Sequence, residues 1–226
     1  MKTAPKFSNE SSREYAYRII RDNIINLDIK PGSMISEQEV AQELNVSRTP
    51  VHEALLELSR SKIVDILPQR GCSVSRINLE LVEEAVFARR TIECAVIEEA
   101  CKMATEQDLS EMRDNIRLQD FYLASKTMEK IMELDNKFHE SLYRITNKMQ
   151  CYYMVQLMNV HFDRLRSMSL HSVKEIKIVD DHRAMMQAMI DKDSSLAKAL
   201  LEKHLSRLHV DVEEIKKHYP EYFPAQ

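Results

Sequence analysis

The stretch Asn45-Val46-Ser47-Arg48-Thr49-Pro50-Val51-His52-Glu53-Ala54-Leu55 decides the fold at the start of this 226-residue chain. Asn45 and Val46 suit a tight turn. Ser47 then predicts the N-cap of a helix, because its side chain can accept an amide hydrogen of the first turn. Pro50 falls in that first turn, where helical amides have no intrahelical partner and proline is tolerated. The core face of the helix is expected at Val51, Ala54, Leu55 and Leu58. The stretch therefore predicts the turn and second helix of a helix-turn-helix.

The residues before this stretch predict two more helices. Apolar side chains recur at helical spacing between Ser11 and Leu27, and the turn Lys30-Pro31-Gly32-Ser33 ends that helix. Ser36 and Glu39 form a capping box, in which each side chain can bond the other residue's backbone amide. A short helix is therefore expected to begin at this box and to pack against the second helix.

The residues after the stretch predict a β-ribbon, or wing. Residues 63–67 and 72–75 have the composition of strands, and Pro68-Gln69-Arg70-Gly71 suits the turn between them. We therefore predict a winged helix-turn-helix domain over residues 10–76, after a flexible tail of residues 1–9. This layout places one helix N-terminus in a DNA major groove. A protein-docking module built on the same three helices is the alternative.

The candidate DNA contacts lie at the start of the second helix and at the wing tip. Arginine suits a guanine edge or a phosphate, and hydroxyl groups suit phosphate oxygens. Arg70, in the wing turn, can enter the adjacent minor groove or hold a phosphate. The candidates from the helix are Ser47, Arg48, Thr49 and His52.

The rest of the chain predicts an all-α bundle. Neither glycine nor proline occurs from Cys72 to Tyr219, and tight β-hairpins rely on glycine. We expect about six helices in residues 77–219 and a C-terminal tail at 220–226. Their expected ranges are 79–104, 107–124, 126–146, 149–170, 172–192 and 194–218. The whole protein is therefore predicted to be mostly α.

Charge and composition narrow the function classes. The chain has 32 basic and 36 acidic side chains, which excludes a globally basic DNA-coating protein. Its apolar runs are too short to cross a membrane, and no signal-peptide core begins the chain, so the expected compartment is the cytoplasm. The four cysteines form no CxxC pair and are expected to be reduced.

Polar residues on apolar helix faces are the main functional signal in the bundle. Asp135 and His139 lie four residues apart on one apolar stripe, and His182 and His204 each lie on the inner face of another predicted helix. A buried carboxylate needs a partner. A divalent transition metal (zinc, nickel, iron or manganese) would satisfy all four side chains and keep coordination positions open. Hydrogen bonds between Asp and His, or an N-cap role, are the alternatives.

One further inward charge pair lies in the first bundle helix. Arg89 and Glu93 share its apolar face at a spacing of four residues. One interpretation is an internal ion pair between the two side chains. In the other, the Arg89 guanidinium binds the carboxylate of an effector through two parallel hydrogen bonds, and Glu93 orients Arg89.

Residues 46–55 together with Pro68-Gln69-Arg70-Gly71 closely resemble the DNA-binding signature of GntR-family transcriptional regulators. The resemblance covers about residues 12–76. It implies that Arg48, Thr49 and His52 face operator bases or phosphates. It also implies that Gln38 touches the DNA backbone, and that Arg70 and Gly71 form the wing contact. His52 stands where the family usually has arginine, and Ser61-Lys62 stands where it usually has Glu-Gly.

Residues 79–219 resemble the ligand-binding FCD domain of the FadR subfamily. The resemblance rests on Arg89-Arg-Thr-Ile-Glu93, Asp135-x3-His139, Asp181-His182 and His204. It implies a metal held by Asp135, His139, His182 and His204, with a small organic acid beside it. Six helices would be typical of the VanR branch.

These features predict a DNA-binding regulator, expected to be a repressor, whose affinity for double-stranded operator DNA changes when a small carboxylic acid binds at the metal. A homodimer is expected, because one small head contacts too little DNA for strong specificity. Two alternatives stay open. One is a metal-dependent hydrolytic enzyme, and the other is a regulator whose metal is purely structural.

Overall fold

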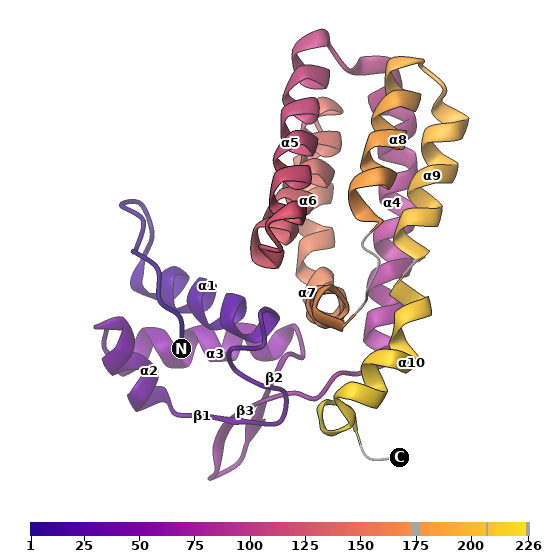
Figure 1. The fold of residues 1–226 in the computed structure, drawn as a ribbon. Helices are drawn as coiled ribbons and strands as arrows, with labels where there is room; N and C mark the ends of the chain where they lie inside the picture. Colours follow the sequence, from indigo (N-terminus) through magenta and orange to yellow (C-terminus); the bar gives the residue numbers. More distant parts are fainter. Residues whose placement is uncertain (173–176, 207, 225–226) are drawn as a thin grey trace.

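The computed structural model describes residues 1–172, 177–206 and 208–224, and its fold is mostly α, as predicted. A small head with three helices and a three-stranded sheet lies beside a helical body (Figure 1). The head elements are α1 (Ser12–Ile25), β1 (Met34–Ile35), α2 (Glu37–Leu44), α3 (Arg48–Arg60), β2 (Val64–Leu67) and β3 (Gly71–Val74). These confirm the predicted winged helix-turn-helix.

The wing is part of a sheet with the order β1-β3-β2, and both pairs are antiparallel. Val64 pairs with Val74 across the ribbon, and Met34 pairs with Ser73 on its other edge. Strand β1 has only two residues, which is too short for a periodic pattern, so the sequence did not predict it.

The helix starts in the head differ from the predicted caps. Ser36 accepts the Glu39 amide at 3.3 Å, which is one half of the predicted capping box. The complete box forms instead between Ser11 and Glu14, at the start of α1. Ser47 occupies the N-cap position of α3, but its side chain makes no capping bond there, so that part of the prediction is wrong. Its hydroxyl therefore stays available to an outside partner.

Two turns in the head place non-glycine residues in the left-handed region. Asn45, at the C-cap of α2, has a φ of 53°, which confirms the predicted turn. Lys62 has a φ of 58°, in the region that favours glycine. The turn before the wing therefore forms without glycine, at a cost of about 1 kcal/mol in backbone strain.

The body contains seven helical segments within the described residues. The prediction placed the fifth helix at 172–192, but it begins at Ile178; residues 173–176 lie outside the described residues. The last predicted helix is described as two, on either side of residue 207, which is also outside them. The VanR branch, which rested on a count of six, stays a prediction. The segments are α4 (Leu79–Met103), α5 (Glu106–Ala124), α6 (Met128–Ile145), α7 (Met149–Ser172), α8 (Ile178–Ile190), α9 (Ser194–Ser206) and α10 (Leu208–His218).

The body is arranged around α4, which packs against α6, α7, α8 and α9. Asn78 caps this helix by accepting the amides of Glu80 and Leu81, as predicted. Three of the neighbouring helices, α6, α8 and α9, carry the inward-facing Asp and His residues. None of the helices in the described part of the chain is both long and apolar enough to span a bilayer.

Both chain ends contact the folded parts. Lys2 exchanges two hydrogen bonds with the side chain of Asn23 in α1. At the other end, the amide of Ile77 donates to the carbonyl of Tyr222 at 2.8 Å, and Tyr222 and Phe223 are buried. The start and the end of the body are therefore joined next to the linker that leads to the head.

Candidate metal centre

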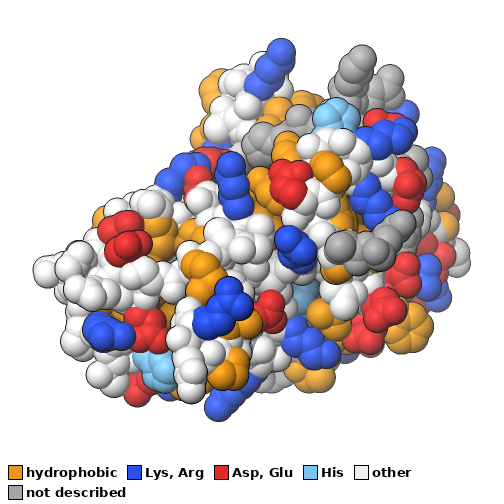
Figure 2. Space-filling view, turned by 90° about the horizontal axis from the view of Figure 1, so that it is seen from below, with side chains coloured by type: hydrophobic (Ala, Val, Ile, Leu, Met, Phe, Trp, Pro, Cys, Tyr) orange, Lys and Arg blue, Asp and Glu red, His pale blue; other side chains and the backbone are white. Residues whose placement is uncertain are grey.

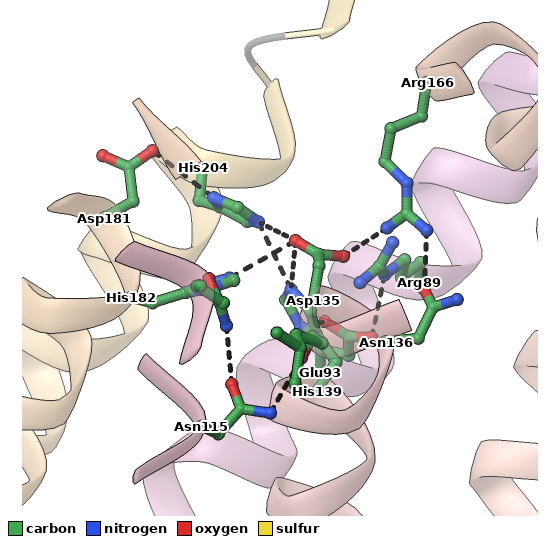
Figure 3. A network of polar contacts seen from close by, with 12 residues as sticks. Arg89, Glu93, Asn115, Asp135, Asn136, His139, Arg166, Asp181, His182 and His204 are labelled. Atoms are coloured by element: carbon green, nitrogen blue, oxygen red, sulfur yellow. Dashed lines mark hydrogen bonds and ion pairs between the residues drawn. The ribbon is translucent and has the colours of Figure 1, made fainter. Parts of the chain in front are cut away.

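Asp135, His139, His182 and His204 converge inside the body (Figure 3). One ligand atom from each residue lies within 4.8 Å of all the others. Asp135 and His139 come from α6, His182 from α8 and His204 from α9, so three helices meet at the cluster. The predicted convergence of these four residues is confirmed.

The ligand atoms surround one carboxylate oxygen. Oδ1 of Asp135 lies 3.5 Å from Nε2 of His182, 3.9 Å from Nε2 of His204 and 4.0 Å from Nε2 of His139. The Nε2 atoms of His139 and His204 are 3.3 Å apart. All three imidazoles therefore turn the same nitrogen towards the centre.

The other nitrogen of each imidazole faces an oxygen acceptor. Nδ1 of His139 lies 2.7 Å from Oε2 of Glu93, and Nδ1 of His182 lies 2.9 Å from Oε1 of Gln119. Nδ1 of His204 lies 3.3 Å from Oδ2 of Asp181. The acceptors Gln119 and Asp181 keep the ring hydrogen of His182 and His204 on Nδ1 and leave the lone pair on Nε2, as around metal-binding histidines. The contact of His139 with Glu93 is close but lacks the geometry of a hydrogen bond.

This tautomer arrangement fits a cation at the centre. With its hydrogen on Nδ1, His204 offers Nε2 as an acceptor, and this atom lies 3.3 Å from Nε2 of His139. The Nε2 atom of His182 is fully buried and has no hydrogen-bond partner among the described residues. Buried acceptors without partners are rare and costly. A divalent ion would satisfy all three Nε2 atoms and the Asp135 carboxylate together.

Burial favours the protonation states that bind a metal. It lowers the pKa of His139, and it lowers the pKa of His182 well below the ordinary histidine value. Burial alone would raise the pKa of Asp135, but the charge of Arg166 and the three histidines outweigh it and lower that pKa. Neutral imidazoles and an ionised carboxylate are the ligand forms that metals require.

Arg89 and Glu93 form a buried pair beside the cluster. Nε of Arg89 donates to Oε1 of Glu93 at 2.8 Å, while Oε2 of Glu93 faces His139. Burial would raise the pKa of Glu93, but Arg89 and His139 lower it to about 2. Glu93 therefore contacts two side chains, Arg89 and the candidate metal ligand His139. The guanidinium carbon of Arg89 lies over the Phe162 ring, 5.1 Å from the ring centroid.

Sequence reasoning missed three residues that act on the cluster. Arg166 of α7 forms an ion pair with Oδ2 of Asp135 (Figure 3). The guanidinium of Arg166 also lies over the Phe162 ring. Gln119 and Asp181 hold two of the imidazoles. Gln119 continues an apolar stripe in α5, so the test that identified the histidines would also have found it.

The candidate DNA contacts lie on the surface of the head. Glu37 in α2 contacts two of them, since its Oε2 lies 3.2 Å from Nη2 of Arg48 and its Oε1 lies 2.8 Å from Nδ1 of His52. Gly71 has a φ of 94°, which favours glycine, and it closes the wing turn that exposes Arg70. The seven candidates, all exposed, are Gln38, Ser47, Arg48, Thr49, His52, Arg70 and Gly71.

Basic side chains do not form one continuous patch in the view of Figure 2. Lys and Arg are interspersed there with acidic and apolar groups. This view therefore shows no broad positive surface, and the candidate contacts stay those at the start of α3 and in the wing.

A winged helix-turn-helix head with an exposed recognition helix defines a DNA-binding transcriptional regulator. The family model described as "Bacterial regulatory proteins, gntR family" matches residues 12–74, and the FCD domain model matches residues 84–207. The chain belongs to the GntR family of bacterial regulators and carries an FCD effector-binding domain.

Known relatives agree with this assignment. The chain is 31% identical over 211 residues to the HTH-type transcriptional repressor RspR of Escherichia coli (strain K12), covering 93% of this chain and 92% of that protein. It is 27% identical over 216 residues to the Uxu operon transcriptional regulator of the same strain, covering 84% and 82%. These relatives and the two domains indicate a transcription regulator.

Solved structures share the fold. E. coli McbR/YncC matches with a TM-score of 0.78 at 19% identity, covering 93% of this chain and 99% of that one. A regulator from Rhodococcus sp. RHA1 described as a putative GntR matches with a TM-score of 0.74 at 21% identity, covering 91% and 99%. At these identities the likeness concerns the fold alone.

Proposed function

We propose that this protein is a metal-dependent repressor of the FadR subfamily, whose operator affinity changes when a small organic acid binds at the metal. The observation that carries the proposal is the buried cluster in which three imidazole Nε2 atoms and Asp135 face one point. Asp135, His139, His182 and His204 would hold the ion. The ion would supply a fixed positive charge and open coordination positions for the effector.

The guanidinium groups beside the cluster support an anionic effector. Arg89 and Arg166 are buried there together with the carboxyl groups of Glu93, Asp135, Asp163 and Asp181. The formal charges of these six groups sum to minus two, and a divalent ion would bring the sum to zero. A carboxylate could then bind at the open coordination positions of the ion and at a guanidinium group beside it. Arg89 is the side chain proposed to bind it.

The exposed apolar side chains of α4 and α7 support a homodimer. Phe87, Met154 and Leu157 are each about two thirds exposed, and the helices that carry them pack together. Large apolar side chains exposed on adjoining elements are typical of protein interfaces. A second copy is the proposed occupant, because a two-fold dimer would place two heads on the two half-sites of an operator.

The test begins with the metal. Isothermal titration of chelator-treated protein with zinc, nickel and manganese should give one site per chain. A selection from random duplexes then supplies an operator, and gel shifts at fixed salt are repeated with each of a panel of small carboxylic acids. At least one acid should change operator affinity only when metal is present.

The other outcomes separate the alternatives. Loss of folding on metal removal would show a purely structural metal. Turnover of an acid by the loaded protein would show an enzyme. Unchanged operator affinity with every acid that binds would contradict the proposed switch.

A further inference from the structure

Helix α7 carries an unusual run of buried polar side chains between its middle and its end. Most charged residues are exposed in folded proteins unless they are paired. The buried polar residues of this run are Asn159, His161, Asp163, Arg164, Arg166 and Ser167. The same part of the helix lies where the body meets the head (Figure 1).

One side of this run is built into the head. Val160 belongs to the apolar core of the head, and Nε2 of His161 lies 2.7 Å from the carbonyl oxygen of Ser61. Arg164 is fully buried, and its guanidinium donates to the hydroxyl and the carbonyl oxygen of Ser75. Ser75 is the residue directly after β3, so Arg164 holds the base of the wing.

The other side of the run contacts the metal centre. Arg166 pairs with Oδ2 of Asp135, donates to Oδ1 of Asn136 at 2.6 Å and lies 3.1 Å from Asp163. Side chains two positions apart on an α-helix point in directions that differ by about 200° around the helix axis. Arg164 and Arg166 therefore extend from nearly opposite sides of one helix, one towards the wing and the other towards Asp135.

We infer that Arg166 is a positioning residue for Asp135, and that α7, held by Arg164 at the other side, transmits the state of the metal centre to the base of the wing. This inference rests on the proposed function. Oδ1 of Asp135 faces the imidazoles and Oδ2 faces Arg166, so a cation at the centre changes the force on that ion pair. Separating either buried guanidinium from its partners is costly. A movement of Asp135 is therefore passed to α7 and to Ser75.

The test uses the full chain and zinc alone. Hydrogen exchange is measured with and without zinc for peptides that cover residues 63–77, which include the amides that Ser75 and Ile77 donate to Ile63 and Tyr222. In the wild-type protein zinc should slow exchange there by about threefold. Zinc affinity is measured separately by competition with a chromogenic chelator.

Two conservative variants distinguish transmission from plain structural support. Arg166→Lys should weaken zinc binding roughly tenfold, because a lysine cannot keep the forked contact with Asp135 and Asn136. Arg164→Lys should leave zinc affinity unchanged but remove the exchange response at residues 63–77. Arg144→Lys is the matched control, since Arg144 forms exposed ion pairs with Asp108 and Glu111, and it should behave as wild type in both measurements.

The outcomes separate the inference from the function on which it rests. Absence of zinc binding to the wild-type protein would overturn both. Normal zinc binding with no exchange response at residues 63–77, or a wild-type response in a folded Arg164→Lys variant, would overturn the inference alone. Circular dichroism melting establishes that each variant is folded.

Discussion

Single residues determine what the buried cluster can bind. The acceptors Gln119 and Asp181 keep hydrogens on the outer nitrogens of His182 and His204, and this leaves two lone pairs facing Asp135. A set of hydrogen bonds alone would not leave the buried Nε2 of His182 without a hydrogen-bond partner. The protonation pattern is therefore as informative as the choice of residues.

Asp135→Asn should remove metal binding. The substitution keeps the shape of the side chain and removes the negative charge, so zinc affinity should fall by at least about a hundredfold. Titration calorimetry measures the change. Asp180→Asn, at an exposed site on α8, is the control and should bind zinc as the wild type does. Equal affinities in the two variants would contradict the assigned site.

Gln119→Leu tests the outer hydrogen bonds. Without the acceptor at 2.9 Å, Nδ1 of His182 loses its partner and the ring is no longer held in one tautomer. Zinc affinity should fall by roughly tenfold to a hundredfold. Gln107→Leu, on the same helix near its exposed start, should change nothing. Wild-type affinity in the Gln119 variant would mean that this bond does not orient His182.

His52→Arg tests the recognition helix. The variant restores the arginine that related regulators usually have at this place, and it adds a permanent positive charge beside Arg48. We expect tighter operator binding, with the slope of log affinity against log salt steeper by about 0.9 for one more phosphate contact. Gel shifts across a salt series measure this. Gln107→Arg, in the body, adds the same charge away from the head, and an equal effect there would contradict a direct contact.

Among the elements, α7 joins the two parts of the molecule most closely. Its residue Val160 belongs to the core of the head, while Arg166 on another side contacts the candidate metal centre. The linker after β3 is held independently, because the C-terminal segment covers it through Tyr222 and Phe223. Head and body are therefore expected to move as coupled units.

The contact of α7 with the head should depend on pH through His161. Burial lowers the pKa of this imidazole below its ordinary value, so its protonation favours the unfolded chain. Its contribution to stability is complete above the unfolded pKa of about 6.5 and is lost as the pH falls from there through the folded pKa. The melting temperature of the wild type should therefore fall more steeply between about pH 6.5 and 5 than that of His161→Gln. Parallel profiles would contradict this, and His218→Gln, at an exposed position, serves as the control.

At the scale of the whole molecule, the proposed dimer follows from the face shared by α4 and α7. Leu157→Glu places a charge among the exposed apolar side chains of α7 and should produce monomers at micromolar concentration in sedimentation velocity runs. Leu118→Glu changes a similarly exposed leucine on α5 and should sediment as the wild type does. An unchanged dimer in the Leu157 variant would place the interface elsewhere.

Much of the fold could be predicted from local patterns. The turn at Asn45, the position of α3, the wing and the helical body all follow from capping residues, apolar spacing and the absence of glycine and proline, since these act within a few residues. The strand Met34–Ile35 and the missing capping bond of Ser47 could not be predicted. A two-residue strand forms only where a partner strand lies beside it, and a capping bond forms only where the side chain and the amide are correctly oriented.

For the site, the sequence by itself determined the ligand types and the inward faces of their helices, since a polar residue on an apolar stripe must be buried with a partner. Only the tertiary structure decided who those partners are. They reach the cluster from four helices and are Glu93, Gln119, Arg166 and Asp181. Gln119 is 63 residues from its partner His182 in the sequence, and Asp181 is 23 residues from its partner His204. Helical periodicity describes the direction of a side chain around its own helix, whereas contacts between helices depend on how the whole bundle packs.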